Sequence, residues 1–362
     1  MASAQISPTV RVVVAMRDRV AWGPARSKGP DPPPRGSVSP SIGLLGDVML
    51  GRGVAKELAS GDPADVWAPE VRELAGSCDA VICNLECCVS ERGSPTERIP
   101  GKPFFFRGPP QAVDALLAIG TTAVSLANNH ALDYGPDALE ETLSHLRTAG
   151  IPAAGAGPDI GSARRGVVVE AGGARVGVVA ASDHPVEFAA DADRLGIAHA
   201  DFRSGTPAWL PKEIAGLREM CDLVVAVIHW GPNMTRRPAP WQLRVATELV
   251  DAGANVVAGH SAHVFHGIGW GERGPLLYDL GDALDDYAVD AELRNDLGVM
   301  AIWRPRSDPE LELVGLRLDY CFTRLAEGVD ADWIAQRLDR ACSELGTSVE
   351  RAAEQRFLVH AS

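Results

Sequence analysis

The chain has 362 residues, of which 46% are hydrophobic and 23% are charged, as in ordinary globular proteins. Lysine and arginine total 34 against 48 for aspartate and glutamate, which gives a formal net charge of −14. This charge opposes binding to nucleic acid or to an anionic membrane, and no apolar run reaches the roughly 18 residues that a membrane helix needs. We therefore expect a soluble cytoplasmic protein with no nucleic-acid partner and no stable membrane insertion.

The seven cysteines favour the same compartment. Their number is odd and none forms a Cys-x-x-Cys pair, which indicates free thiols rather than a disulfide framework. Cys83, Cys87 and Cys88 crowd one stretch, but no second group of Cys or His residues completes a tetrahedral metal site with them. Buried or loop thiols are the preferred interpretation.

Residues 1–40 contain seven prolines and six basic side chains, a composition that cannot bury enough apolar surface to fold. We interpret them as a disordered arm or as a start assigned too far upstream. From residue 41, apolar runs alternate with helical patterns, which predicts an α/β fold with central parallel strands. We expect one domain over 41–330 and a helical C-terminal extension, 331–362, packed on it. The expected strands are 42–45, 80–83, 123–126, 167–170, 175–180, 223–228, 255–258, 275–280, 297–303 and 311–318, and the expected helices are 52–59, 109–119, 136–149, 238–250 and 331–344.

Polar residues suited to binding a metal follow five of these strands. In open α/β sheets the ligand crevice lies beyond the carboxyl ends of the strands, so these side chains are expected to meet. Carboxylates, an amide and imidazoles form the mixed oxygen and nitrogen set that divalent transition metals prefer. The residues are Asp47, then Asn84 and Glu86, then Asn128, Asn129 and His130, then His229, and finally His260 and His263.

Five segments together resemble the CapA family of capsule and poly-γ-glutamate biosynthesis proteins, which is related in fold to calcineurin-like metallophosphoesterases. The stretch 280–287, with Leu280-Gly281-Asp282, is similar to that family too, and the resemblance covers roughly residues 41–320. It implies a four-layer αββα sandwich with a two-metal site. The segments are Gly46–Arg52, Asn84–Glu86, Ser125–Gly135, His229–Gly231 and Gly259–Val264.

The resemblance also implies roles for single residues. Asp47 and His263 would hold one divalent metal, Asn129, His229 and His260 would hold the other, and Glu86 would bridge them. Met49 stands where the wider superfamily has a histidine, which leaves a single metal as an alternative to two. The ligand set suits Mn, Fe, Zn or Co equally well.

Further residues are candidates for catalysis and for substrate binding. His130 could protonate the leaving group, and Asp133 could either orient that imidazole or cap the following helix. Arg52, Arg107 and His184 are candidate substrate contacts, with surface or loop roles as the alternative. Lys102, Arg236 and Arg237 also lie near the motifs and could contact a carboxylate or phosphate.

These observations lead to a metal-dependent hydrolase that acts on an amide, ester or phosphoester of a small or oligomeric acidic substrate. The family resemblance points to γ-glutamyl compounds, although the acidic chain would repel a polyanion unless metals and arginines reverse the field locally. The alternatives are a non-catalytic CapA-type subunit that binds polymer or partners in capsule assembly, and a nucleotide phosphoesterase. The sequence predicts no particular oligomeric state.

Overall fold

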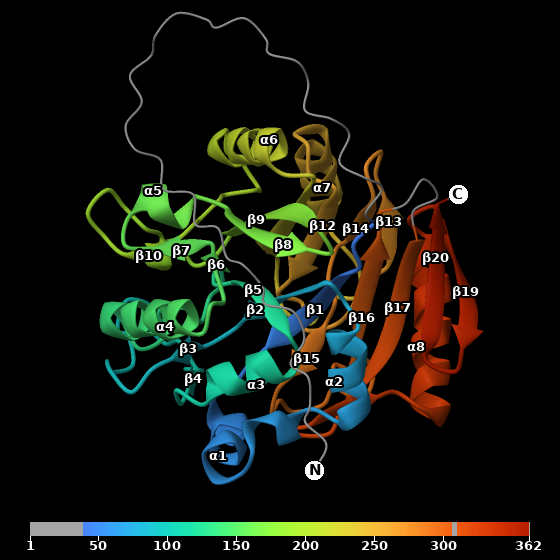
Figure 1. The fold of residues 1–362 in the computed structure, drawn as a ribbon, viewed down its shortest axis with the longest axis horizontal. Helices are drawn as coiled ribbons and strands as arrows, with labels where there is room; N and C mark the ends of the chain where they lie inside the picture. Colours follow the sequence, from blue (N-terminus) through green and yellow to red (C-terminus); the bar gives the residue numbers. More distant parts are fainter. Residues whose placement is uncertain (1–38, 306–309, 362) are drawn as a thin grey trace, which may run out of the picture.

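The computed structural model describes residues 39–305 and 310–361 (Figure 1). All of the arm predicted at 1–40 except its last two residues lies outside this range. None of the helices within the described ranges combines the length and the apolar character that a bilayer crossing requires.

The larger of two main sheets joins a parallel half to an antiparallel half. Its strand order is β19-β20-β17-β16-β1-β2-β5-β6, with β15 paired to β1 and β18 paired to β17. The parallel strands are β1 (Ile42–Val48), β2 (Ala80–Leu85), β5 (Thr121–Ser125), β6 (Ala153–Ala154) and β15 (Asp282–Leu284). The antiparallel strands are β16 (Leu297–Arg304), β17 (Glu310–Leu318), β18 (Thr323–Leu325), β19 (Thr347–Ala353) and β20 (Arg356–Ala361).

The smaller sheet is mainly parallel and has the order β13-β14-β12-β11-β9-β8. Every residue of its central strand β11 is buried, as expected for a parallel strand covered on both faces. Gly172 and Gly173, both with positive φ, form the turn of the antiparallel β8–β9 hairpin, as predicted. The strands are β8 (Val167–Ala171), β9 (Ala174–Ser182), β11 (Leu223–His229), β12 (Val256–His260), β13 (Ile268–Trp270) and β14 (Pro275–Leu277).

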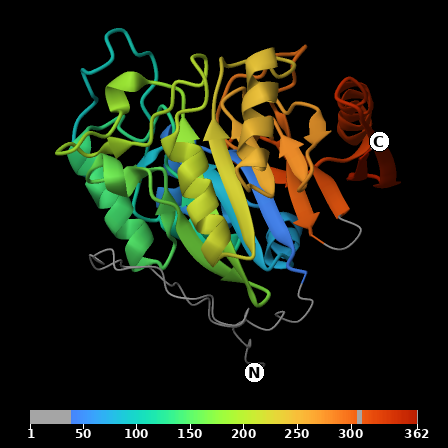
Figure 2. The same cartoon turned by 90° about the horizontal axis from the view of Figure 1, so that it is seen from above.

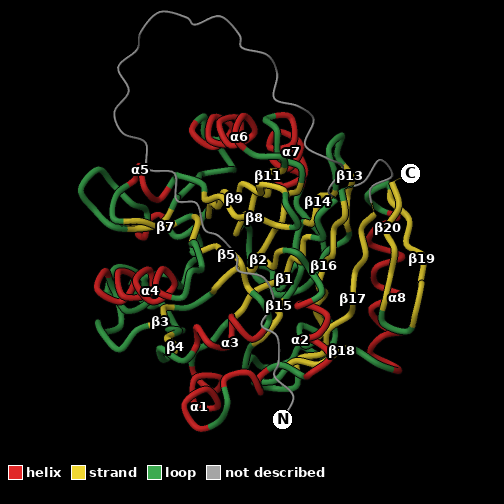
Figure 3. The backbone as a smooth tube through the Cα atoms, viewed as in Figure 1, coloured by secondary structure: helices red, strands yellow, loops and turns green. Residues whose placement is uncertain are grey.

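The two sheets pack face to face, and helices cover their outer faces (Figures 2 and 3). Alternate residues of β1 show this: Leu44 belongs to the core between the sheets and Leu45 to the core under the helices. The helices on the larger sheet are α1 (Arg52–Ser60), α2 (Pro69–Gly76), α3 (Ala112–Ala118) and α4 (Pro136–Thr148), and those on the smaller sheet are α6 (Trp209–Met220) and α7 (Pro240–Asp251). The predicted α/β class is confirmed.

The C-terminal region differs from the helical extension predicted for 331–362. Helix α8 (Gly328–Ser343) agrees with the predicted helix, but residues after it form the β19–β20 hairpin, which continues the larger sheet through β17. Most side chains of β19 are exposed, so its sequence lacks the apolar alternation that would mark a strand. The remaining short elements are η1 (Pro63–Val66), β3 (Cys88–Val89), β4 (Arg107–Gly108), β7 (Ala156–Gly157), α5 (Ile160–Ala163), η2 (Val186–Phe188) and β10 (Gly196–Ile197).

Candidate metal centre

The polar residues at the strand ends come from both sheets. Asp47 lies near the end of β1, and Glu86 directly follows β2. His229 and His260 are the last residues of β11 and β12 and are paired in register across these parallel strands. Because the two sheets pack face to face, the carboxylates of one sheet meet the imidazoles of the other.

Two glycines allow the chain segments of the site to approach closely. A Cβ atom on Gly46 would lie 1.9 Å from the carbonyl oxygen of Gly281, and one on Gly259 would lie 2.0 Å from that of Tyr278. Because Gly46 has no side chain, the two segments come close enough for the backbone N–H of Asp47 to donate to the Gly281 carbonyl at 3.0 Å. This contact aligns β15 with β1 and sets Asp282 in register with Asp47.

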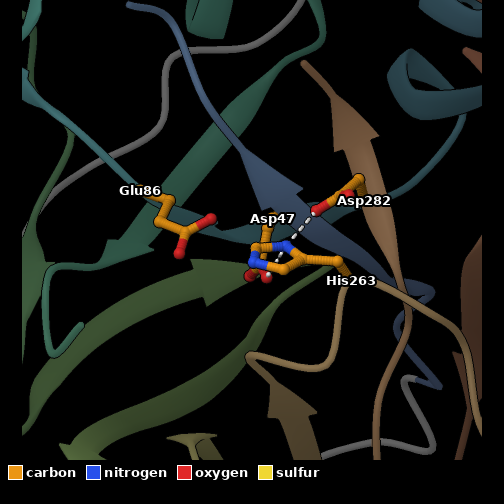
Figure 4. Close-up of side chains that lie close together, drawn as sticks. All are labelled: Asp47, Glu86, His263 and Asp282. Atoms are coloured by element: carbon orange, nitrogen blue, oxygen red, sulfur yellow. Dashed lines mark hydrogen bonds and ion pairs between the residues drawn. The ribbon is translucent and has the colours of Figure 1, made fainter. Parts of the chain in front are cut away.

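Four buried side chains form the centre of the site: Asp47, Glu86, His263 and Asp282 (Figure 4). Each offers one ligand atom, and these atoms lie within 4.8 Å of one another. His263 Nδ1 is 2.8 Å from Asp282 Oδ1 and 3.6 Å from Asp47 Oδ2. Sequence reasoning gave Asp282 no role, although its Leu-Gly-Asp segment belonged to the resemblance.

Several of these polar atoms are buried without a hydrogen-bond partner. Both carboxylate oxygens of Glu86 are in this state, and Glu86 Oε1 lies 3.9 Å from His130 Nε2 and 4.0 Å from His229 Nε2. A buried polar atom without a partner is costly, so a group of them facing one another calls for a bound ion or ligand. The other atoms at the candidate ligands are His229 Nε2, His260 Nδ1, Asn129 Oδ1 and Asp282 Oδ2. Oxygen and imidazole nitrogen donors fit a divalent transition metal.

Burial and neighbouring charge shift the titration of these groups. Burial, followed by the charge of Asp47, raises the pKa of Glu86 well above its usual range. Burial and the nearby His184 lower the pKa of His229 well below that of a free imidazole, so its ring is neutral and can offer a lone pair. Burial by itself would raise the pKa of Asp47, but the hydrogen bond and the charge of His260 lower that pKa overall.

The end of β12 and the loop after it bring His260 and His263 to Asp47. His260 Nδ1 lies 3.0 Å from Asp47 Oδ1, and the backbone N–H of Ser261 donates to Asp47 Oδ2 at 3.3 Å. Ser261 has a φ of 103° and His263 a φ of 56°, conformations that non-glycine residues rarely adopt. Such strain persists where the surroundings enforce it, and it clusters at functional sites.

The two neighbouring asparagines after β5 have different surroundings. The side-chain amide of Asn128 donates to Asn84 Oδ1 at 3.1 Å and to the Leu85 carbonyl at 2.8 Å, and its oxygen accepts from the His130 N–H at 3.0 Å. Asn128 therefore has a structural role, because its side chain joins the loop after β5 to the end of β2. Asn129 keeps its buried Oδ1 without a partner, as a metal ligand would.

His130 is held by Asp133. His130 Nδ1 is 2.6 Å from Asp133 Oδ2, and its ring stacks on Phe106 with centroids 4.0 Å apart. Burial is the main cause that lowers the pKa of His130, to about 4. The residue at the N-cap of α4 is Gly135, so Asp133 orients the imidazole and does not cap that helix. Lys102 Nζ lies 3.2 Å from Asp133 Oδ1 and offsets the negative charge of this carboxylate.

The family model of the bacterial capsule synthesis protein PGA_cap matches residues 41–287. The chain belongs to this family. The match includes every metal-ligand candidate and ends before α8.

Relatives of this chain include a probable polyglutamine synthesis accessory protein of Mycobacterium tuberculosis, 30% identical over 84% of this chain and 92% of that one. The capsule biosynthesis protein CapA of Bacillus anthracis is 29% identical over 67% of this chain and 59% of that one. The PGA biosynthesis protein CapA of Bacillus subtilis is 27% identical over 68% of this chain and 63% of that one.

The three residues predicted to bind substrate lie in different surroundings. Arg52 forms an ion pair with Asp286 at 3.2 Å and is 38% exposed. The guanidinium of Arg107 lies 4.1 Å from the centre of the Tyr134 ring, and among the described residues it forms no hydrogen bond or ion pair with a predicted metal ligand. The structure thus gives Arg107 a packing contact, whereas Arg52 remains beside the site.

His184 lies nearest to the candidate ligands. Its ring centroid is 5.2 Å from that of His229, and its Nδ1 is paired with Asp183. It lines a cavity of about 380 Å³ together with Arg203 and Asn233. Arg203 was not among the predicted residues because no motif surrounds it in the sequence.

Proposed function

We propose that this PGA_cap family member is a metal-dependent hydrolase of an acidic substrate, with a γ-glutamyl amide as the first candidate bond and esters or phosphoesters as the others. The observation that carries the proposal is the set of buried donor atoms without partners around Glu86. A purely structural network would leave few such atoms unsatisfied. The names of the relatives refer to capsule, PGA and polyglutamine synthesis, which supports a polymer as the substrate class; that this polymer is acidic is part of our proposal.

The residues present fit one or two divalent metals. Asp47, His263 and Asp282 would hold one ion, as their spacing of less than 4.8 Å, with Glu86 included, suggests. His229, His260 and Asn129 would hold a second, and Glu86 would be shared. A divalent metal in such a site acts as a Lewis acid and makes water a usable nucleophile near neutral pH.

His130 would transfer the proton of the attacking water during hydrolysis. Asp133 accepts a hydrogen bond from Nδ1, which leaves the lone pair on Nε2, and this atom faces Glu86 Oε1 at 3.9 Å. Because its pKa is lowered to about 4 by burial, the ring is neutral at pH 7. Nε2 would therefore take a proton from the attacking water and return it to the leaving group.

The cavity beside His229 would hold the substrate. Arg203 lines it and can donate hydrogen bonds to a carboxylate, while Asn233 can hydrogen bond to an amide. Asp183 and His184 line it too, and because Asp183 accepts the hydrogen bond from His184 Nδ1, the neutral ring offers Nε2 as an acceptor for an amide N–H. We further propose that the layered arrangement is the calcineurin-like sandwich, and that the seven free thiols reflect a reducing compartment such as the cytoplasm.

The test combines metal analysis with hydrolysis assays. Elemental mass spectrometry of the purified chain is followed by assays with γ-glutamyl oligomers and aryl phosphate esters in the presence of Mn, Fe, Zn or Co. We expect bound metal, hydrolysis of at least the γ-glutamyl compound, and loss of both in His229→Ala but not in His145→Ala, a half-buried histidine of α4. A chain that holds no metal after reconstitution and hydrolyses nothing would favour the non-catalytic binding subunit.

A further inference from the structure

A second cavity, of about 420 Å³, lies between helix α8 and the loop that follows β11. Four arginines line it: Arg236 and Arg237 from the loop, and Arg337 and Arg340 from the helix. Two glutamates, Glu292 and Glu344, also line it, so its formal charge is positive within a chain whose net charge is −14. We call this cavity the arginine pocket.

The arginines of the pocket are only partly neutralised by the protein. Arg236 pairs with Glu292, an exposed residue. The side chains of Arg237 and Arg340 make no hydrogen bond or ion pair with residues 39–305 or 310–361. Like charges held close together repel, so an anion in the pocket would relieve a cost that the protein alone does not offset.

Arg337 is the fixed element of the pocket. Its Nε donates to the Phe265 carbonyl at 3.0 Å, and its guanidinium lies 5.0 Å from the centre of the Phe265 ring and 5.4 Å from that of Trp333. Burial, with help from the charge of Arg236, lowers its pKa to about 10, so it remains charged at pH 7. A charged, oriented guanidinium against aromatic rings suits a carboxylate carried on an aliphatic stem.

The pocket is linked to the loops of the metal centre. Phe265 lies two residues after His263, and the loop of Arg236 follows the strand that ends at His229. The backbone N–H of Met234 donates to the Ala262 carbonyl at 2.8 Å and joins the two loops. A ligand in the pocket is therefore held by the same loops that carry the candidate metal ligands.

We propose that the arginine pocket binds a segment of an oligomeric carboxylate, an acidic peptide chain, at a subsite that shares its loops with the metal centre. From Trp333 to Arg340 the helix rises by about 10 Å, which corresponds to about three residues of an extended peptide. A single carboxylate would leave most of the guanidinium donors unused. The inference rests on the proposed function only in the acidic nature of the substrate.

The test measures binding without turnover. Fluorescence anisotropy of a labelled γ-linked glutamate oligomer is recorded with the full chain and with Glu86→Gln as the background that prevents hydrolysis. Arg237→Gln/Arg340→Gln should weaken binding by about tenfold or more, because charge-assisted hydrogen bonds are lost. The matched control is Arg147→Gln/Arg165→Gln, which removes the same charge from exposed positions elsewhere and should leave the affinity unchanged.

Competitors identify the ligand chemistry. Free glutamate should not displace the labelled oligomer at concentrations where the unlabelled oligomer does. Displacement by inorganic phosphate at the same concentrations as the oligomer would overturn the assignment to carboxylates. Equal affinity of the pocket variant and the wild type, an equal loss in the control variant, or no binding by the wild type would overturn the pocket itself. A failed hydrolysis assay with intact binding would refute only the proposed catalysis.

Discussion

His130 Nδ1 and Asp133 Oδ2 lie 2.6 Å apart, in a part of the site where both side chains are buried. The contact sets the tautomer of the imidazole and directs Nε2 towards Glu86. A proton carrier held in this way is ready for the reaction without rearrangement.

Asp133→Asn tests this relationship. An amide in place of the carboxylate no longer favours a proton on Nδ1, so we expect the rate constant of hydrolysis to fall by about 10²-fold or more, with a smaller change in KM. The pH profile of the rate should change as well. Asp137→Asn, at an exposed position in the first turn of α4, is the control and should behave as wild type. A wild-type rate constant and pH profile in Asp133→Asn would show that Asp133 does not position the imidazole for catalysis.

Glu86→Gln separates stability from metal binding. The wild-type carboxylate is buried, and neither oxygen has a hydrogen-bond partner. Because the amide carries no charge, we expect the variant to unfold at a higher temperature than the wild type after both are treated with a chelator. Added Mn or Zn should then raise the unfolding temperature of the wild type only. Glu312→Gln, a buried glutamate on β17, should keep the metal response. An equal metal response in Glu86→Gln would exclude Glu86 as a ligand.

Gly46→Ala should disrupt the alignment of β1 with β15. The added Cβ would lie 1.9 Å from the Gly281 carbonyl oxygen, so backbone must move, and we expect a loss of about 3 kcal/mol or more in the free energy of unfolding. Gly216→Ala in α6 is the matched control, since no atom lies within 4 Å of its added Cβ, and should stabilise the chain by about 0.5–1 kcal/mol. Denaturant unfolding measures both. Equal stability of the two variants would contradict the close approach.

His266 makes the folded state sensitive to acid. Burial is the main cause that lowers its pKa to about 4, and the charge of Arg337 adds to it, whereas the Thr235 carbonyl acts in the opposite direction. The unfolded chain takes up this proton near pH 6.5 and the folded chain only near pH 4, so stability falls as pH decreases through this window.

Protonation of His266 lowers the free energy of unfolding by at most about 3 kcal/mol, and this full loss is reached below pH 4. In His266→Asn the free energy of unfolding should therefore fall less steeply between pH 7 and pH 4.5 than in the wild type. His360→Asn, at an exposed position on β20, is the control and should keep the wild-type slope. An unchanged slope in His266→Asn would show that this imidazole does not limit acid stability.

The parts of the fold that could be predicted are those with strong local patterns. Buried parallel strands such as β11 are continuously apolar, and α4 begins with Pro136 and is followed by Gly150. Helix α6 went unpredicted because Pro211 and Gly216 interrupt its pattern. The β19–β20 hairpin lies at a sheet edge, where exposed side chains hide the alternation.

The site could be predicted where a polar residue ends an apolar strand, as His229 does. Asp282 and Arg203 could not be assigned in this way. The strand that begins at Asp282 has three residues, and it forms only by pairing with β1, far away in the sequence. Tertiary contacts of this kind leave no periodic signal in a short segment.

The distance along the chain between Asp47 and Asp282 has a consequence for biosynthesis. Their pairing in β1 and β15 cannot form until residues of both strands have left the ribosome, and His229, His260 and His263 come late as well. An incomplete nascent chain therefore contains Asp47 and Glu86 but lacks most of the other candidate ligands. Any ion that needs the whole set can be captured only after Asp282 has been translated, so loading of the site would also report that every strand carrying a candidate ligand has left the ribosome.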